Sequence, residues 1–145
     1  MVEVLVWDFS VNDALHGGNI GHAACKVRGD YISWWPQHAV TLKGGRAPGS
    51  PNSEAADVQA EGRGPDHRIT LTCLREDDMV AWWRTFRTSN EYRLFVQNCS
   101  TVVAMALKAG GGTSLTSGFG WAYHSWNVIW TPNDVRRYAW AIQRG

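Results

Sequence analysis

The stretch from Asn98 to Gly112, NCSTVVAMALKAGGG, constrains the fold more than any other part of this sequence. It starts with residues that cap helices, continues with apolar residues and ends in glycines, which is the pattern of a helix with clear start and stop signals. The expected helix is apolar almost all round, and a helix of that kind belongs in the interior of a protein. We therefore expect it to be the buried central helix of the fold.

The chain has the size and composition of one globular domain spanning residues 1–145. A chain of 145 residues buries roughly two thirds of its unfolded surface, so it needs no disulfide or metal to hold a core. Its formal net charge of +1 argues against a nucleic-acid-binding protein, which would carry a basic excess. No run of 18 apolar residues occurs, so we expect no membrane span.

Neither a signal peptide nor a disulfide framework is indicated. The first residues, MVEVLVWDFS, resemble a strand and lack a basic segment and a cleavage site. The three cysteines are widely spaced and odd in number. We expect a protein that is cytoplasmic as synthesised, and any secretion would use a route that needs no cleavable signal.

The remaining elements are read from hydrophobic periodicity and capping residues. Strands are predicted over Val2–Phe9, His22–Val27, Tyr31–Pro36, His67–Leu74 and Tyr92–Val96, and further helices from Glu76 and from Thr131, where Pro132 and Asp134 complete a helix start. This mixture of about three helices and a few strands in irregular order predicts an α+β fold, with an antiparallel sheet packed against the helices.

The segment from Lys43 to Asp66 differs in composition from the rest. It contains five glycines and three prolines and no large apolar residue. Such a segment buries too little surface to order itself, and it is long for a structureless connection within one domain. We therefore expect a flexible loop over residues 43–66, acting as a mobile flap or present as a disordered insertion.

Cys99 and His22 are the candidate catalytic pair. Cys99 lies at the start of the central helix, where unpaired backbone N–H groups and the helix dipole favour a thiolate, the form that attacks carbonyl carbons. His22 follows Gly21 at the beginning of a strand, from which an imidazole can face the helix start and act as a base.

The residues around this pair resemble a known family. The motif GHAACKV, a turn, a second strand and, much later, NCSTVVAMAL are similar to the circularly permuted papain-like hydrolases, which include permuted relatives of NlpC-type peptidases and lecithin:retinol acyltransferase-like proteins. The resemblance covers about residues 1–110 and implies a Cys–His hydrolase or acyltransferase acting on an amide, ester or thioester. In that family a polar residue about a dozen positions after the histidine orients the imidazole; here that position holds Trp34.

Strand alternation indicates which residue replaces the missing orienting group. With a two-residue turn at positions 29–30, His22 faces Gln37 across the next strand. Gln37 is then the best-placed residue to orient the imidazole. His38 and Ser33 are alternatives if the turn is shifted, and a simple Cys–His dyad is another.

The other cysteines and the short motifs indicate no metal and no cofactor. Cys25 lies three positions after His22 on a strand and points to the opposite face, and Cys73 has apolar neighbours that predict a core position. No CxxC or HxxxH spacing and no glycine-rich phosphate loop is present.

The leading hypothesis is that the domain is catalytic: a cysteine hydrolase that cleaves the amide bond of a peptide or a cell-wall stem peptide, in a bacterial effector or toxin whose immunity or host-protein partner is unknown. The alternatives are an acyltransferase or lipid hydrolase of the same fold, or a non-catalytic binding module built on the nine tryptophans.

Overall fold

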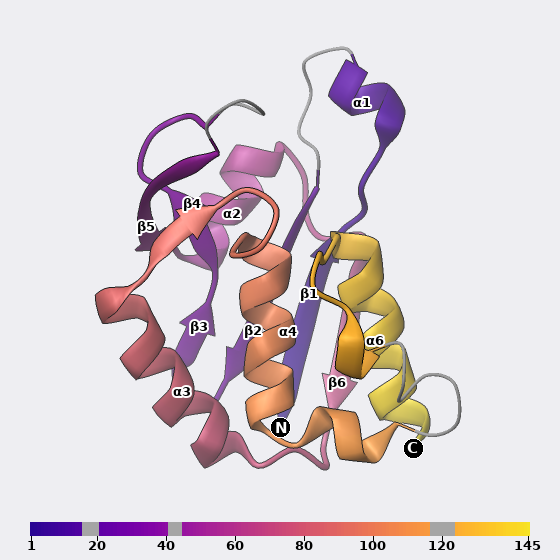
Figure 1. Ribbon diagram of the computed structural model, residues 1–145. Coiled ribbons are helices and arrows are strands. Elements are labelled where there is room, and N and C mark those ends of the chain that lie inside the picture. Colours follow the sequence, from indigo (N-terminus) through magenta and orange to yellow (C-terminus); the bar gives the residue numbers. More distant parts are fainter. Residues whose placement is uncertain (16–20, 41–44, 117–123) are drawn as a thin grey trace.

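The computed structural model describes residues 1–15, 21–40, 45–116 and 124–145, in which antiparallel sheets pack against helices (Figure 1). This arrangement confirms the α+β class. The elements are β1 (Val2–Trp7), α1 (Val11–Leu15), β2 (His22–Val27), β3 (Asp30–Ile32), β4 (Trp34–Pro36), β5 (Arg46–Pro51), α2 (Glu54–Glu61), β6 (His67–Leu71), α3 (Glu76–Ser89), β7 (Glu91–Arg93), α4 (Cys99–Ala109), the 3₁₀ helix η1 (Gly112–Leu115) and α6 (Pro132–Arg144).

Four strands form the main sheet in the order β3-β2-β1-β6, and all neighbours are antiparallel. β1 pairs with β2 along its whole length and ends with Trp7 opposite His22. Successive side chains of a strand point to opposite faces. Val4 and Val6 therefore join the large core on one face, whereas Leu5 and Trp7 form a smaller cluster on the other.

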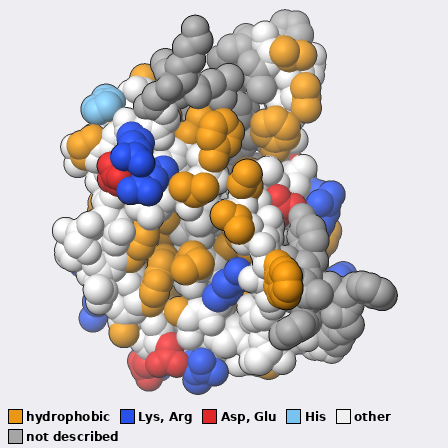
Figure 2. Space-filling view, viewed as in Figure 1, with side chains coloured by type: hydrophobic (Ala, Val, Ile, Leu, Met, Phe, Trp, Pro, Cys, Tyr) orange, Lys and Arg blue, Asp and Glu red, His pale blue; other side chains and the backbone are white. Residues whose placement is uncertain are grey.

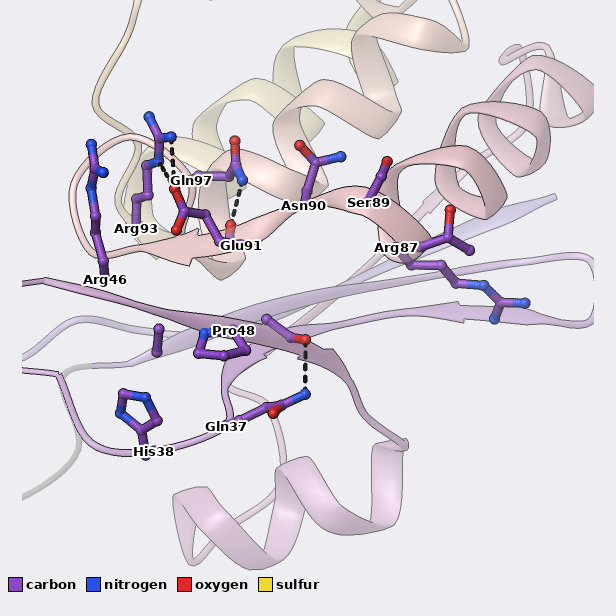
Figure 3. A pocket seen from close by; sticks show the side chains of 13 residues that line it. Gln37, His38, Arg46, Pro48, Arg87, Ser89, Asn90, Glu91, Arg93 and Gln97 are labelled. Atoms are coloured by element: carbon purple, nitrogen blue, oxygen red, sulfur yellow. Dashed lines mark hydrogen bonds and ion pairs between the residues drawn. The ribbon is translucent and has the colours of Figure 1, made fainter.

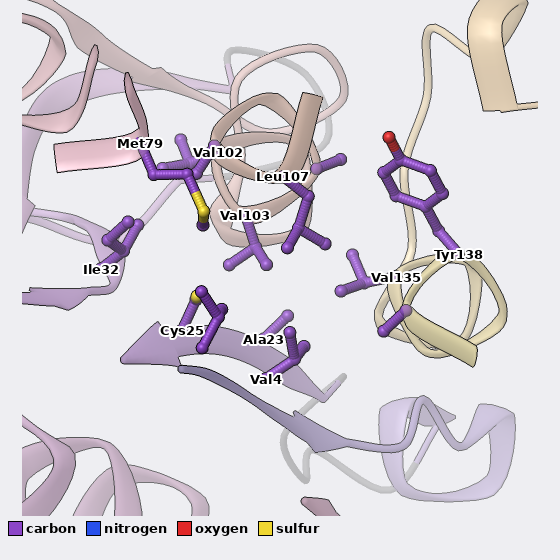
Figure 4. Close-up of a cluster of buried hydrophobic side chains, with 14 of the residues drawn as sticks. Val4, Ala23, Cys25, Ile32, Met79, Val102, Val103, Leu107, Val135 and Tyr138 are labelled. Carbon is purple, nitrogen blue, oxygen red and sulfur yellow. The ribbon is translucent and has the colours of Figure 1, made fainter. Parts of the chain in front are cut away.

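Helix α4 is the central helix, as its sequence predicts. It lies in front of the main sheet between α3 and α6 (Figure 1). Val103 and Leu107 of α4 meet Val4 and Ala23 of the sheet and Val135 of α6 in one continuous core (Figure 4). Burying such side chains contributes about 1.5–3 kcal/mol each, so the two helices and the sheet stabilise one another.

The segment expected to be a flexible loop is instead largely ordered. Residues 46–61 form β5 and α2, and β5 lies between β4 and β7 in a second, three-stranded sheet. The Ser53 side chain accepts a hydrogen bond from the N–H of Ala56, and Gly62 ends the helix with φ of +70°. Both capping residues are present in the sequence, but the many glycines and prolines around them predicted a loop.

Mainly polar contacts hold α2 against the sheet, together with one apolar side chain, Val58, which packs against the small cluster around Leu5 and Trp7. Glu54 at its start forms ion pairs with Lys26 of β2 and Arg68 of β6, and Asp57 in its middle is fully buried. A helix anchored in this way has no hydrophobic periodicity to reveal it, which explains why the prediction of a loop was wrong.

The β2–β3 turn is displaced by one residue from the expected position. Arg28 and Gly29 form the turn, and Arg28 adopts a left-handed φ of 53°, as two-residue hairpin turns require. The pairing register of the strands consequently differs from the expected one by two residues. Trp35 rather than Gln37 lies beside His22, with the ring centroids 4.6 Å apart.

Cys73 is exposed, contrary to the expected core position, because β6 ends at Leu71 and the chain leaves the sheet there. Among the helices that the structure describes, none is long and apolar enough to cross a membrane.

Gly49 makes a close approach that yields a first prediction. A Cβ at this position would lie 1.9 Å from Cζ2 of Trp34, a fully buried side chain that packs edge-on against Phe86. Gly49→Ala should therefore lower the free energy of unfolding by about 1–3 kcal/mol, the usual cost of overpacking, as measured by urea denaturation. Gly64→Ala is the matched control, because a Cβ there meets nothing within 4 Å; equal losses in the two variants would contradict the prediction.

Candidate active site

The structure brings Cys99 and His22 together. Cys99 is the first residue of α4 and His22 the first residue of β2, and the two elements pack against each other. The His22 imidazole and the backbone of Ala23 are close enough to the Cys99 sulfur to favour its thiolate form, and both lower the pKa of the thiol. The Ser100 hydroxyl lies 3.9 Å from the sulfur. The thiol therefore lies in a ring of hydrogen-bonding groups and remains partly exposed.

Asn98 holds the start of α4 in place. Its side-chain oxygen accepts a hydrogen bond from the N–H of Thr101 at 2.8 Å, as an N-cap residue does. Its amide nitrogen donates to the carbonyls of Leu94 and Trp130, at 2.9 and 3.2 Å. One side chain thus joins the loop after β7, the helix start and the segment before α6, and fixes the position of the neighbouring thiol.

Asp57 of α2 is the third member of the cluster. Its Oδ2 lies 2.9 Å from Nε2 of His22, and both side chains are buried. Ser33 Oγ is 3.0 Å from the same nitrogen. Because Nε2 is engaged by Asp57 and Ser33, Nδ1 is the ring nitrogen left to face the Cys99 thiol.

Three further donors surround the Asp57 carboxylate. Tyr31 donates to Oδ2 at 2.7 Å, and Trp35 and Asn52 donate to Oδ1 at 2.7 and 3.2 Å. A buried carboxylate is stable only when its oxygens are hydrogen-bonded or paired with a charge. The pattern of donors indicates that Asp57 is ionised in the folded protein.

Aromatic rings enclose the imidazole of His22. The Trp35 ring stacks on it with centroids 4.6 Å apart and an interplanar angle of 25°, and the Trp7 ring lies 5.5 Å away. These rings exclude water from the contact between His22 and Asp57 and restrict rotation of the imidazole. Low water access strengthens the electrostatic interaction between the charged groups.

The pKa of His22 is raised and the pKa of Cys99 is lowered, so the pair favours the imidazolium and thiolate forms. Burial alone lowers the pKa of His22, but the Cys99 and Asp57 side chains outweigh it and raise that pKa well above its ordinary value. Burial alone raises the pKa of Cys99, but the charge and hydrogen bond of His22, with the Ala23 backbone, bring it below its ordinary value. Burial also opposes ionisation of Asp57, and its hydrogen bonds to His22 and Tyr31 nevertheless hold its pKa below the usual range.

The expected contact of Gln37 with the imidazole does not form. Gln37 is exposed, and its amide nitrogen lies 3.4 Å from the carbonyl oxygen of Gly49. His38 is exposed as well. Of the three candidates for the orienting role, only Ser33 contacts His22.

Sequence reasoning missed Asp57 because it lies in the segment predicted to be a loop. The available signal was the pair of caps at Ser53 and Gly62, which predicts a short helix and places Asp57 in its middle. That signal indicates order at this position, but no local pattern connects the helix to His22.

Cys25, His67 and His124 contact other residues than Cys99, His22 and Asp57. Cys25 is buried in the core on the opposite face of β2. His67 contacts Asp8 at 3.0 Å and Arg136 at 3.1 Å, and His124 packs against Trp130 and Tyr138. Within the described ranges no group of three or more His, Cys, Asp or Glu residues could hold a metal ion.

Comparison with known proteins finds relatives among bacterial toxins. The chain is 34% identical over 97 residues, 62% of its length, to a multifunctional-autoprocessing repeats-in-toxin protein of Vibrio vulnificus. It is 36% identical over 83 residues, 52% of its length, to the protein of the same name from Vibrio cholerae serotype O1. The matched region is 2% of the length of each toxin. No solved structure matches the chain.

A sequence family covers most of the chain, including Asp57 and Cys99 but not His22. The match runs over residues 40–145 and is to the family described as the IcsB middle domain. The chain therefore belongs to the IcsB middle-domain family.

Proposed function

We propose that this chain is a thiol enzyme that forms an acyl-enzyme on Cys99, with His22 as the base and Asp57 as the residue that orients the base. The observation that supports the proposal is the cluster of Cys99, His22 and Asp57 from three separate elements: Asp57 holds the imidazole at 2.9 Å, α4 packs against β2, and the charge of His22 lowers the pKa of the thiol. A nucleophile, a base and an oriented third group in mutual contact are the signature of covalent catalysis.

The proposed reaction needs only the Cys99 thiolate, the His22 imidazole, the substrate and an acceptor such as water. The Cys99 thiolate attacks the carbonyl carbon of the substrate, and a carbon–sulfur bond forms. The His22 imidazolium gives its proton to the leaving amine or alcohol as the bond between carbonyl carbon and leaving group breaks. Neutral His22 then takes a proton from water, or from an acceptor amine or alcohol, which attacks the thioester and returns the thiolate.

The start of α4 supplies the donors for the oxyanion. The first N–H groups of a helix have no partner within it, and the Asn98 side chain takes only that of Thr101. The N–H groups of Cys99 and Ser100 lie in the same turn as the nucleophile. Backbone donors in this position stabilise the negative charge of a tetrahedral intermediate.

The order of the elements supports a permuted papain-like arrangement. The histidine lies on β2 near the amino terminus, and the cysteine starts a helix much later in the chain. The family and the toxin relatives fit a role in a bacterial effector or toxin. We therefore propose delivery from the cell that makes the protein, by a route that the domain itself does not determine.

The first candidate reaction is hydrolysis of an amide bond in a peptide or a cell-wall stem peptide. The thiolate–imidazolium pair is suited to this reaction because the imidazolium can protonate the poor amine leaving group. Incubation with a peptide pool and with peptidoglycan fragments tests it, and release of new amino groups by the wild-type chain is the expected result.

A second candidate, transfer or hydrolysis of an apolar acyl group, is favoured by exposed hydrophobic side chains near the thiol. Phe95 and Val96, just before the helix of Cys99, are 50% and 45% exposed, and Val128 and Ile129 are 67% and 54% exposed. Val128 and Ile129 directly precede Trp130, whose carbonyl oxygen accepts a hydrogen bond from Asn98. Figure 2 shows hydrophobic side chains over the amino-terminal part of α4 and the loop before it. Such a surface next to the nucleophile fits an apolar acyl chain.

Cys99→Ala should abolish acylation of the protein while leaving it folded. With p-nitrophenyl acetate, the wild-type chain should release p-nitrophenolate and gain one acetyl group on Cys99, detected by mass spectrometry of peptides. Loss of the nucleophile should lower the rate by several orders of magnitude. Cys73→Ala is the control, because this exposed thiol lies elsewhere and its removal should change little. A folded Cys99→Ala variant with full turnover would contradict Cys99 as the nucleophile, and absence of turnover in the wild-type chain would leave the non-catalytic binding module as the better interpretation.

Asp57→Asn should move the reactivity of Cys99 to higher pH. The Asp57 carboxylate favours the imidazolium, so its removal lowers the pKa of His22, and the weaker positive charge then raises the pKa of Cys99. The thiolate is lost as the pH falls through the thiol pKa. The alkylation rate with iodoacetamide at about pH 6 should therefore fall about tenfold for each pH unit by which the thiol pKa rises. The rate–pH profile of Gln37→Ala should match that of the wild type, and a profile displaced as far as that of Asp57→Asn would contradict the assignment.

Phe95→Ser should reduce the preference for long acyl groups if the apolar surface holds them. The ratio of kcat/KM for p-nitrophenyl octanoate to that for the acetate ester should fall about tenfold, since several buried methylene contacts are lost. Met105→Ser, at an exposed apolar residue further along α4, should leave the ratio unchanged. An unchanged ratio in Phe95→Ser would remove the support for the apolar acyl substrate.

A further inference from the structure

A polar groove of about 920 Å³ lies between β5, β7 and the end of α3, on the part of the molecule that carries Gln37. Three arginines line it: Arg46 from β5, Arg93 from β7 and Arg87 from α3. Figure 3 shows Arg46 and Arg93 at one end of the groove and Arg87 at the other. The groove therefore has arginine side chains at both of its ends (Figure 3).

The arginines are not explained by the stability of the fold. Arg46 lies directly opposite Arg93 in the register of β5 and β7, and like charges in that position destabilise a sheet. Glu91 is the one acidic residue of the lining, and it is already bonded to Arg93, at 2.9 Å from Nε and 2.7 Å from Nη2. Within the described part of the chain, neither Arg46 nor Arg87 has an acidic partner.

The charge is local. The whole chain has a formal net charge of only +1, but three arginines and one glutamate give the groove lining a net charge of about +2. Surface arginines usually find a carboxylate or point into solvent separately. In this protein all three line one concave surface, together with the amides of Gln37, Asn90 and Gln97.

We infer that this groove binds a ligand that carries two or more phosphate groups. A guanidinium group matches the oxygens of a phosphate with two parallel hydrogen bonds, and each phosphate brings up to two negative charges and three acceptor oxygens. A ligand with several phosphates offers separate groups of acceptor oxygens to the arginines at the two ends of the groove (Figure 3). An acidic peptide has one negative charge per carboxylate and spreads these charges over about 3.3–3.6 Å of chain per residue, so it presents less charge per unit length than a polyphosphate does.

The site is separate from the cluster around Cys99 but adjacent to it in the chain. Gln97 lines the groove and lies two residues before Cys99, and its side-chain amide donates to the Glu91 carbonyl oxygen within the groove lining. Binding by the arginines does not require the thiol, so the inference does not depend on the proposed function. The Cys99→Ala variant should bind the ligand as the wild type does.

Isothermal titration with inorganic tripolyphosphate in a buffer of low ionic strength tests the inference. The wild-type chain should bind one tripolyphosphate, and Arg46→Gln and Arg87→Gln should each weaken binding about tenfold, the loss expected for one charge-assisted contact. Arg144→Gln, which removes an exposed arginine from the end of α6, is the matched control and should bind normally. Urea denaturation should show that Arg46→Gln is at least as stable as the wild type, because one of two opposed charges is removed.

Two further probes distinguish the source of the phosphate. Sedimentation with phosphatidylcholine vesicles that contain about 5% of a bisphosphorylated phosphoinositide, compared with vesicles lacking it, tests a lipid headgroup. Binding of both probes indicates a headgroup, and binding of tripolyphosphate alone indicates a soluble ligand; either result supports the inference if Arg46→Gln and Arg87→Gln reduce it. Absence of binding to both probes, equal binding by these variants, or binding of a hexaglutamate peptide in place of tripolyphosphate would overturn it.

Discussion

The buried contact between Asp57 and His22 is the interaction on which the rest of this structure depends. A carboxylate without solvent must be hydrogen-bonded on both oxygens, and four side chains meet that requirement here: His22, Tyr31, Trp35 and Asn52. They come from β2, β3, β4 and the turn before α2, so one carboxylate joins the main sheet to the second sheet and fixes α2 across them. Removing one partner of a buried ion pair typically costs about 3–5 kcal/mol, which is a large part of the stability of a domain of this size.

The same contact determines the chemistry of the thiol. His22 lies between Asp57 and Cys99, so the carboxylate acts on the sulfur through the charge of the imidazole. The start of α4 holds the sulfur in place, because the neighbouring Asn98 side chain donates hydrogen bonds to the loop after β7 and to the segment before α6. The buried core under α4 and the polar cap at its start together keep the three groups in place, which is the preorganisation that the proposed covalent mechanism would need.

Part of the fold and of the candidate site could be predicted from the sequence. The central helix, its start at Cys99 and the position of His22 at the beginning of a strand depend on neighbours within one or two turns, and the structure has them as predicted. The predicted contact between Gln37 and His22 was wrong because the hairpin turn is displaced by one residue, and such a displacement changes every cross-strand partner. The core position predicted for Cys73 was wrong because the strand ends at Leu71, three residues before the predicted end at Leu74 (74 − 71).

The sequence by itself determined the class of the fold and the helix caps, including the capping box of Thr131 and Asp134, because these follow from local propensity and local hydrogen bonds. Only the tertiary structure decided which acidic residue contacts His22 and which arginines line the groove between β5, β7 and α3. Asp57 lies 35 residues from His22, and Arg46 lies 47 positions before its partner Arg93 (93 − 46). Contacts between such distant residues are set by how α2 and β5 pack against the sheets, and polar anchoring of this kind leaves no periodic pattern in the chain.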